Sequence, residues 1–198
     1  SNQNDKKIVI ICRALIRHLT QVTPMYVSSS DLYYNDIKKI VIDLMKHNKP
    51  FIIRLFPGEG ERGDPISVRL ANDFKDIQIS SEDDFYKLTS SAKIVIHTYD
   101  GTTFLEDLVN NNPCMLLINP TITPLRESAK EFFDELCNVG ICHYSVESLS
   151  YSIQSISDIE RWWADEKTVI ARKFFANNFA YRSDNPIKYL SDVIKSFN

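Results

Sequence analysis

The stretch "KIVIHTYDGTTFLEDLVNNNPCMLLIN", residues 93 to 119, decides the fold. It begins with a short apolar run at 93–98 and ends with another at 114–119. Runs of this length without strict alternation are typical of parallel strands that are covered on both faces. The residues between them place Phe104, Leu105 and Leu108 at helical spacing. The stretch therefore predicts a β-strand, a helix and a second, parallel strand.

The same alternation extends over the first three quarters of the chain. Further strand-like runs lie at 7–12, 50–56 and 77–80, and helical patterns lie at 33–48, 64–74, 81–92, 102–113 and 124–140. From Ser145 onward the pattern predicts helices only. We therefore expect an α/β fold, a Rossmann-like doubly wound parallel sheet with C-terminal helices, in a single domain over residues 1–198.

Composition limits the function classes. With 43% hydrophobic and 25% charged residues, the chain is typical of a globular domain. The net charge is -3 and the isoelectric point is near 5.8, so the overall field attracts neither nucleic acid nor anionic lipid. No apolar run reaches membrane-spanning length and no signal peptide is evident, which predicts a cytoplasmic protein. The four cysteines lack the paired spacing of a zinc site, and we expect buried thiols and no metal.

The stretch "PFIIRLFPGEGERGDP", residues 50 to 65, contains the pattern Gly58-x-Gly60-x-x-Gly63 after an apolar run. This is the glycine spacing of a dinucleotide-binding loop. However, Glu59 and Glu61 put two negative charges where phosphate would lie. We therefore expect a surface loop that closes over a ligand, with neither NAD nor FAD as a cofactor.

Arg54 interrupts an apolar strand just before the strand ends. A charge in that setting needs a partner or a ligand. One interpretation is a salt bridge, buried or at the sheet edge. The other is a guanidinium at the carboxyl end of a parallel strand, where open α/β sheets bind ligands, presented to phosphate.

A stronger phosphate candidate follows the strand at 93–98. His97 lies at its end, Gly101 lies in a short turn, and Thr102 and Thr103 open a helix, so that hydroxyls and free N–H groups meet at one point. Glu106 lies one turn later, off the centre of the apolar stripe, where it could accept hydrogen bonds from a ribose diol. The alternative is a capped helix with a solvated Glu106. No Gly-Lys-Thr follows a glycine loop, so ATP hydrolysis is not expected.

Two segments carry a family resemblance. "RLFP" at 54–57 and "HTYDGTTFLEDLVNNNPCMLLINP" at 97–120 resemble the C-terminal, nucleotide-sugar-binding half of a GT-B glycosyltransferase. The chain is most similar to bacterial surface-polysaccharide transferases of lipopolysaccharide and capsule loci. Their pattern has "RLYP", "TTFLE", "NNP" and a "WW" pair, which correspond here to Arg54–Pro57, Thr102–Glu106, Asn111–Pro113, and Trp162 with Trp163.

The resemblance implies a role for each of these residues. Thr102 and Thr103 hold the donor phosphate, Glu106 holds the ribose, and Arg54 neutralises charge on the leaving group. The chain departs from the related capsule transferases at Phe56-Pro57, where they carry a His-Pro pair. A histidine acting on phosphate is therefore missing there.

A GT-B enzyme has two Rossmann-like domains, and 198 residues can hold only one. The chain also begins Ser-Asn without a methionine, so we expect the C-terminal half of a longer protein. In inverting members the acceptor base usually comes from the N-terminal domain, so no catalytic residue is assigned here. The partners implied are a nucleotide-sugar donor, a saccharide or lipid-linked acceptor and that N-terminal domain. Peripheral attachment to the inner membrane is the alternative to a purely cytoplasmic location. The isolated domain is expected to bind nucleotide without turnover.

Several interpretations stay open. His97 could contact donor or acceptor, or could be a satisfied histidine at a strand end. Arg126 is a minor candidate for the cleft, because such loops approach the base or sugar in GT-B folds. Trp162 and Trp163 are more typical of a core than of a partner surface. The competing functions are a nucleotide-sugar epimerase-like or phosphotransferase domain, and a non-catalytic Rossmann-like binding module.

Overall fold

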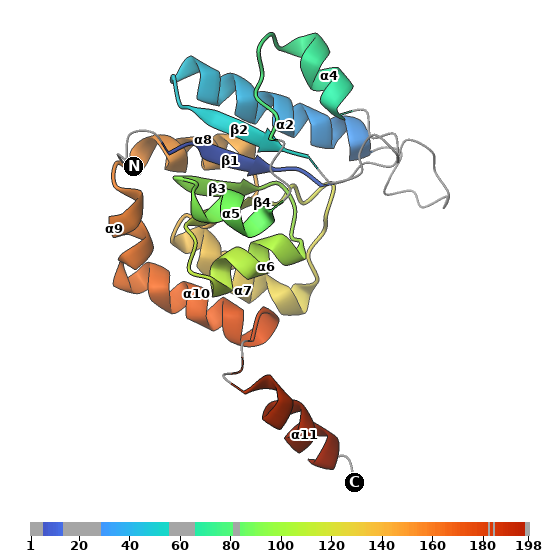
Figure 1. Ribbon diagram of the computed structural model, residues 1–198, viewed down its shortest axis with the longest axis vertical. Helices are drawn as coiled ribbons and strands as arrows, with labels where there is room; N and C mark the ends of the chain where they lie inside the picture. Colours follow the sequence, from blue (N-terminus) through green and yellow to red (C-terminus); the bar gives the residue numbers. More distant parts are fainter. Residues whose placement is uncertain are drawn as a thin grey trace.

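The computed structural model describes residues 6–13, 29–55, 66–80, 84–181, 183 and 185–196. Its centre is a five-stranded sheet in the order β2-β1-β3-β4-β5, and every pair of neighbouring strands is parallel. The strands are β1 (Ile8–Ile11), β2 (Phe51–Arg54), β3 (Ile94–His97), β4 (Cys114–Leu117) and β5 (Cys142–His143). The predicted α/β fold with a parallel sheet is confirmed (Figure 1).

Two strand predictions need correction. The run at 77–80 forms no strand, because only Ile79 makes a bridge, to Ile53. Ile79 remains 37% exposed, so this segment lacks the cover on both faces that a buried parallel strand needs. Conversely, β5 was not predicted, because its two residues carry no periodic signal.

Helices cover both faces of the sheet, as expected of a doubly wound fold. On one face lie α2 (Ser29–Lys46), α4 (Ile66–Asp73) and α8 (Val146–Ser155). On the other face lie α5 (Phe85–Ser90), α6 (Thr102–Val109), α7 (Glu127–Asn138) and α10 (Glu166–Phe179). Side chains alternate along each strand: Ile8 and Ile10 face the first group, and Val9 and Ile11 face the second.

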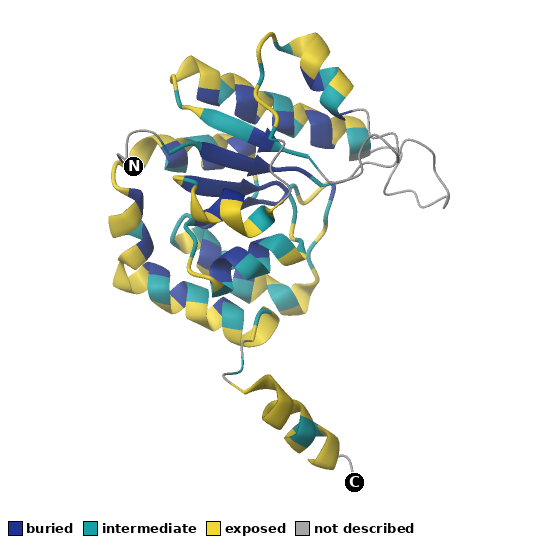
Figure 2. Ribbon diagram, in the orientation of Figure 1, coloured by how far each residue is buried: buried dark blue, intermediate teal, exposed yellow. Residues whose placement is uncertain are grey.

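The C-terminal quarter is helical, as predicted. After α8 come α9 (Ile159–Ala164), α10 and α11 (Pro186–Ser196). Helix α10 packs against α6 and α7 through Ala171 and Phe175. Helix α11 has no buried residue and projects away from the rest of the molecule (Figures 1 and 2).

The order of the strands indicates the edge of the sheet at which a ligand is expected to bind. The chain passes from β1 to β2 on one side and later enters β3 on the other side of β1. Ligands of open α/β sheets bind in the crevice at such a switch point, beyond the carboxyl ends of the strands. Here those ends are Ile11 of β1 and His97 of β3. The predicted glycine loop, with Gly58, Gly60 and Gly63, lies outside the described residues.

Candidate functional site

One row of residues crosses the carboxyl edge of the sheet. Ile11 pairs with Arg54 of β2 on one side and with His97 of β3 on the other. Paired residues of parallel strands point to the same face, so Arg54 and His97 lie about 10 Å apart across Ile11. The Arg54 guanidinium carbon lies 5.3 Å from the centre of the Phe85 ring on α5. The described residues thus give Arg54 an aromatic neighbour at the edge where the sequence predicted it.

Helix α6 begins at this edge with the predicted threonines. Gly101 is the N-cap residue, and no side chain caps the helix. Thr102 is exposed and Thr103 is half-buried. A Cβ atom on Gly101 would lie 2.1 Å from Cε2 of Tyr99, so the Tyr99 ring requires a glycine here. The first turn therefore presents hydroxyls and uncapped N–H groups beside an aromatic ring.

His97 lies at the end of a buried polar network. Its Nε2 is 2.9 Å from Oδ2 of Asp107, and both side chains are fully buried. Asn112 donates from Nδ2 to Oδ1 of the same carboxylate at 2.8 Å and lies 3.4 Å from Oγ1 of Thr89. On its other side, Nδ1 of His97 is 3.4 Å from Oγ1 of Thr103. His97 has no exposed surface, and Thr103 is the member of this network that lies in the first turn of α6.

Asp107 is the residue that the sequence analysis missed. Successive helical residues are separated by about 100°, so Asp107 lies about 60° from Phe104 and on the buried side. Glu106 lies about 200° from Phe104 and is half-buried, next to the turn formed by Thr102 and Thr103. The helical spacing of Phe104, Asp107 and Leu108 already indicated that Asp107 lies on the buried side of the helix. The apolar stripe was assigned to hydrophobic residues alone, and the acidic member was overlooked.

A second polar cluster lies across the switch point, on the face covered by α2. The Tyr33 hydroxyl is 2.6 Å from Oγ1 of Thr98 and accepts a hydrogen bond from the backbone N–H of Arg13 at 2.8 Å. Burial raises the pKa of Tyr33 well above its usual value, so the phenol stays protonated. These residues line a small hollow together with Asp36 and Asn119.

In that hollow, Asn119 donates from Nδ2 to Asp36 at 2.8 Å. Burial raises the pKa of Asp36. Neither this pair nor Tyr33 was identified from the sequence. Their spacing along the chain carries no motif, because Asn119 lies 83 residues after Asp36, in the segment that follows β4, and meets α2 only in the fold.

Arg126, the remaining sequence candidate, and His143 of β5 differ in setting. Arg126 is the exposed N-cap residue of α7, in the connection that follows β4 at the same edge. His143 is buried in β5, where Nε2 donates to the carbonyl of Gly140 at 3.0 Å and Nδ1 accepts from Ser148 at 2.9 Å. Burial lowers the pKa of His143 to about 4. His143 is therefore a neutral structural histidine at neutral pH.

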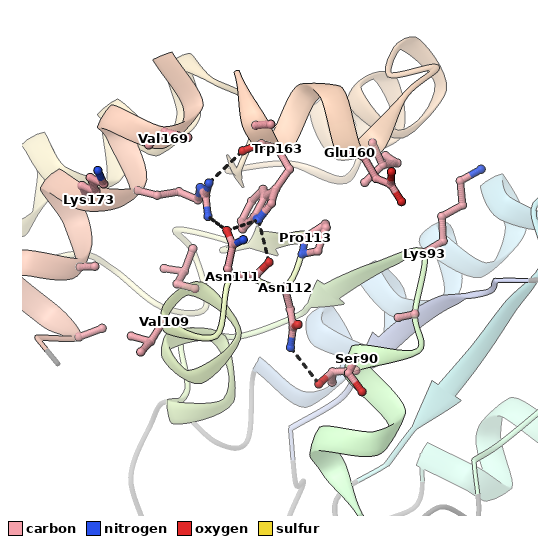
Figure 3. Close-up of a pocket in the computed structure, with 18 of the residues that line it drawn as sticks. Ser90, Lys93, Val109, Asn111, Asn112, Pro113, Glu160, Trp163, Val169 and Lys173 are labelled. Atoms are coloured by element: carbon pink, nitrogen blue, oxygen red, sulfur yellow. Dashed lines mark hydrogen bonds between the residues drawn. The ribbon is translucent and has the colours of Figure 1, made fainter. Parts of the chain in front are cut away.

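A cavity of about 1120 Å³ lies at the opposite edge of the sheet (Figure 3). It lies near the amino ends of β3 and β4, beside Lys93 and Pro113, and is closed by Trp163 and Arg172 of α9 and α10. Arg172 is already engaged: it stacks 3.9 Å over the Trp163 ring and donates to Asn111 and to the Trp163 carbonyl. These contacts hold α9 and α10 against the end of α6.

Trp162 and Trp163 belong to the packing rather than to an open surface. Trp163 is buried and donates from Nε1 to Asn111, and Trp162 donates to the carbonyl of Val139. Among the described residues no group of three His, Cys, Asp or Glu side chains forms a metal site. Within the same residues no helix is long and apolar enough to cross a bilayer.

The chain is similar to known proteins in structure and in sequence. In a solved structure, a spinosyn rhamnosyltransferase in complex with spinosyn aglycone is similar to the chain with a TM-score of 0.47 and 15% identity. The similarity covers 87% of this chain and 41% of the rhamnosyltransferase, so the chain spans less than half of that protein's length. No curated protein matches the chain. The model of the LIC12162 family transferases matches residues 1–194, and the chain therefore belongs to the LIC12162 family of transferases.

Proposed function

We propose that the chain is the donor nucleotide-sugar-binding domain of a glycosyltransferase that acts in bacterial surface-polysaccharide biosynthesis. The observation that carries the proposal is the position of the threonine-headed helix α6 at the switch point of the sheet. Membership in a transferase family supports group transfer over epimerisation. The resemblance of "RLFP" and "TTFLE" to GT-B transferases supports a sugar as the transferred group.

The geometry suits the leaving group of such a reaction. In glycosyl transfer, the acceptor oxygen bonds to the anomeric carbon of the donor, and the acceptor's proton passes to a base. The bond from that carbon to the diphosphate oxygen breaks, and its electron pair leaves with the diphosphate. Charge therefore develops on the diphosphate, where N–H groups and hydroxyls stabilise it. Thr102 and Thr103 supply such donors at the start of α6.

The remaining proposed contacts surround that point. Glu106 lies one turn from both threonines and can accept from the ribose diol. Arg54 lies in the same sheet row as His97 and can balance the diphosphate charge. Arg126, at the N-cap of α7, lies on the route to the base or the sugar. The acceptor base is assigned to a second domain, and no cofactor is required.

A binding screen tests the proposal. The chain is titrated with UDP, GDP, CDP, CMP and their sugars, and binding is followed by thermal shift and calorimetry. At a ligand concentration 100 times Kd, stabilisation is about 2.7 kcal/mol. We expect one nucleotide class to bind, and the isolated chain to transfer no sugar. Absence of binding by every nucleotide would overturn the proposal, and conversion of a nucleotide sugar without an acceptor would favour the epimerase-like alternative.

A further inference from the structure

We propose that Asp107 and His97 are positioning residues that couple phosphate binding at Thr103 to protonation of His97. The inference rests on the proposed function, because it takes the donor diphosphate as the group bound at Thr103. The buried chain of contacts from Asn112 through Asp107 and His97 to Thr103 carries it.

The direction of each hydrogen bond follows from the chemistry of the groups. A carboxylate only accepts, so Asp107 requires that Nε2 of His97 carry a proton. The second oxygen of Asp107 is occupied by the Asn112 amide, which fixes the carboxylate. A neutral imidazole has one N–H, so Nδ1 is then an acceptor. The hydroxyl of Thr103, 3.4 Å away, therefore donates its proton to Nδ1.

This arrangement decides what Thr103 offers to a ligand. A hydroxyl has one proton, and while that proton points at His97, Thr103 presents only lone pairs to a phosphate oxygen. When His97 is protonated, Nδ1–H donates to Oγ1 of Thr103 instead. The hydroxyl proton is then free to turn to the phosphate. Phosphate binding therefore favours protonated His97, and binding takes up a proton.

Asp107 is the carboxylate that directly contacts the His97 ring. Ile11 of β1 and Leu116 of β4 flank it in the sheet, and Phe104 packs edge-on at 5.6 Å between ring centres. Two ionisable groups of other elements neighbour this network: the Cys114 thiol of β4 interacts electrostatically with Asp107, and Arg54 of β2 lies in the same sheet row as His97. Arg172 of α10 lies at the opposite edge and interacts electrostatically with Cys114. Burial raises the pKa of Cys114 well above its usual value, so the thiol stays neutral.

The test is calorimetry of the full chain with UDP-glucose, GDP-mannose and CDP-glucose between pH 5.5 and 8.5. Sugar esters of nucleoside diphosphates have no ionisation in this range, so any pH dependence belongs to the protein. Each titration is repeated in two buffers of different ionisation enthalpy, which gives the number of protons taken up. We expect proton uptake on binding and an affinity that falls by up to tenfold per pH unit as the pH rises.

Three variants separate coupling through the Thr103 hydroxyl from direct attraction between the charge of protonated His97 and the phosphate. Thr103→Ser should keep the proton uptake, and Thr103→Val should lose most of it. Asp107→Asn can donate from its amide to Nε2, which leaves the proton on Nδ1 and turns Thr103 toward the ligand permanently. This variant should bind at high pH with little pH dependence. Glu135→Gln, exposed on α7, is the matched control and should match the parent.

The outcomes distinguish the two proposals. If Thr103→Val takes up as many protons as the parent, the coupling is wrong while the donor site stands. If no nucleotide sugar binds to the parent at any pH, the proposed function fails and the coupling fails with it. If Asp107→Asn does not fold, imidazole ¹⁵N spectra of the parent decide. At high pH they should report His97 protonated on Nε2, and a proton on Nδ1 would overturn the inference.

Discussion

Glu106 and Asp107 are adjacent in the chain, yet the helix gives them opposite environments. Asp107 is fully buried against His97, and Glu106 is half-buried near the start of α6. A fully buried carboxylate with both oxygens hydrogen-bonded is fixed in place and unavailable to a ligand. Glu106 makes no side-chain hydrogen bond to the described residues, so it can reorient toward a ribose.

The first prediction concerns Glu106 and Thr103. A carboxylate that accepts from a ribose diol contributes roughly 1.5 to 3 kcal/mol, so Glu106→Gln should weaken nucleotide binding about tenfold. Thr103→Val should weaken a nucleoside diphosphate more than the bare nucleoside, because it removes a hydroxyl from the phosphate position. Calorimetry measures both. If both variants bind like the parent at unchanged Tm, α6 is an ordinary helix.

The second prediction concerns Gly101. Its Cβ would overlap the Tyr99 ring, so Gly101→Ala should cost about 1 to 3 kcal/mol of unfolding free energy. Removing the ring should remove the cost: in a Tyr99→Ala background, Gly101→Ala should be nearly neutral. Gly140 is the comparison, because its φ of 75° strains any other residue whatever the space around it. Equal costs of Gly101→Ala in both backgrounds, measured by urea unfolding, would contradict the steric account.

At the scale of elements, β5 and α8 are joined by a histidine that must stay neutral. His143 bonds Gly140 and Ser148, and burial lowers its pKa to about 4 from 6.5. The unfolded chain takes up a proton below about pH 6.5, whereas the folded chain does not until about pH 4. The stability is therefore complete above pH 6.5 and is lost as the pH falls toward 4.

The third prediction follows from this loss of stability at low pH. Between pH 7 and pH 5, His143 should contribute a loss of about 1 to 2 kcal/mol in the free energy of unfolding. His143→Gln can keep both hydrogen bonds but does not titrate, so its stability should fall less over this range. His47→Gln, at an exposed position after α2, is the control and should follow the parent. Identical pH profiles for His143→Gln and the parent would refute the assignment.

The strands and helices also show which features the sequence could predict. Buried strands such as Ile94–His97 were found because apolar runs indicate burial on both faces. Helix α7 (Glu127–Asn138) was found within the pattern at 124–140, which runs past the helix to Gly140, whose φ is positive. The segment at 77–80 failed because an apolar run does not reveal whether a helix will cover it. The hydroxyls of α6 and the Arg54 position were found from local patterns. The Asp107 and Tyr33 networks were not, because their partners come from distant elements.

At the scale of the whole molecule, the body of the fold and α11 differ. Two core clusters hold the sheet between its helices, and neither includes a residue of α11. Ile187, Leu190 and Ile194 lie along one side of α11, and each is more than half exposed. The stability of the body therefore should not depend on this helix.

The fourth prediction tests this separation. A chain that ends after Tyr181 should melt within about 1 to 2 °C of the parent, because α11 buries no side chain. The same chain should keep its nucleotide affinity, since α6 and β3 are unchanged. Differential scanning calorimetry measures the first quantity and titration calorimetry the second. A fall in Tm of more than about 5 °C would contradict the independence of the body from α11.

The position of β1 between β2 and β3 has a consequence for biosynthesis. Ile8 pairs with Phe51 and with Ile94, so β1 needs a neighbour that is synthesised 86 residues after it. At about 5 to 20 residues per second, roughly 4 to 17 s separate the synthesis of these two partners. Until Ile94 has been made, the apolar segment Ile8–Ile11 therefore has at least one open edge on the ribosome. His97 ends the strand that closes it, so the nascent chain gains a protected sheet and a buried His97 in the same event.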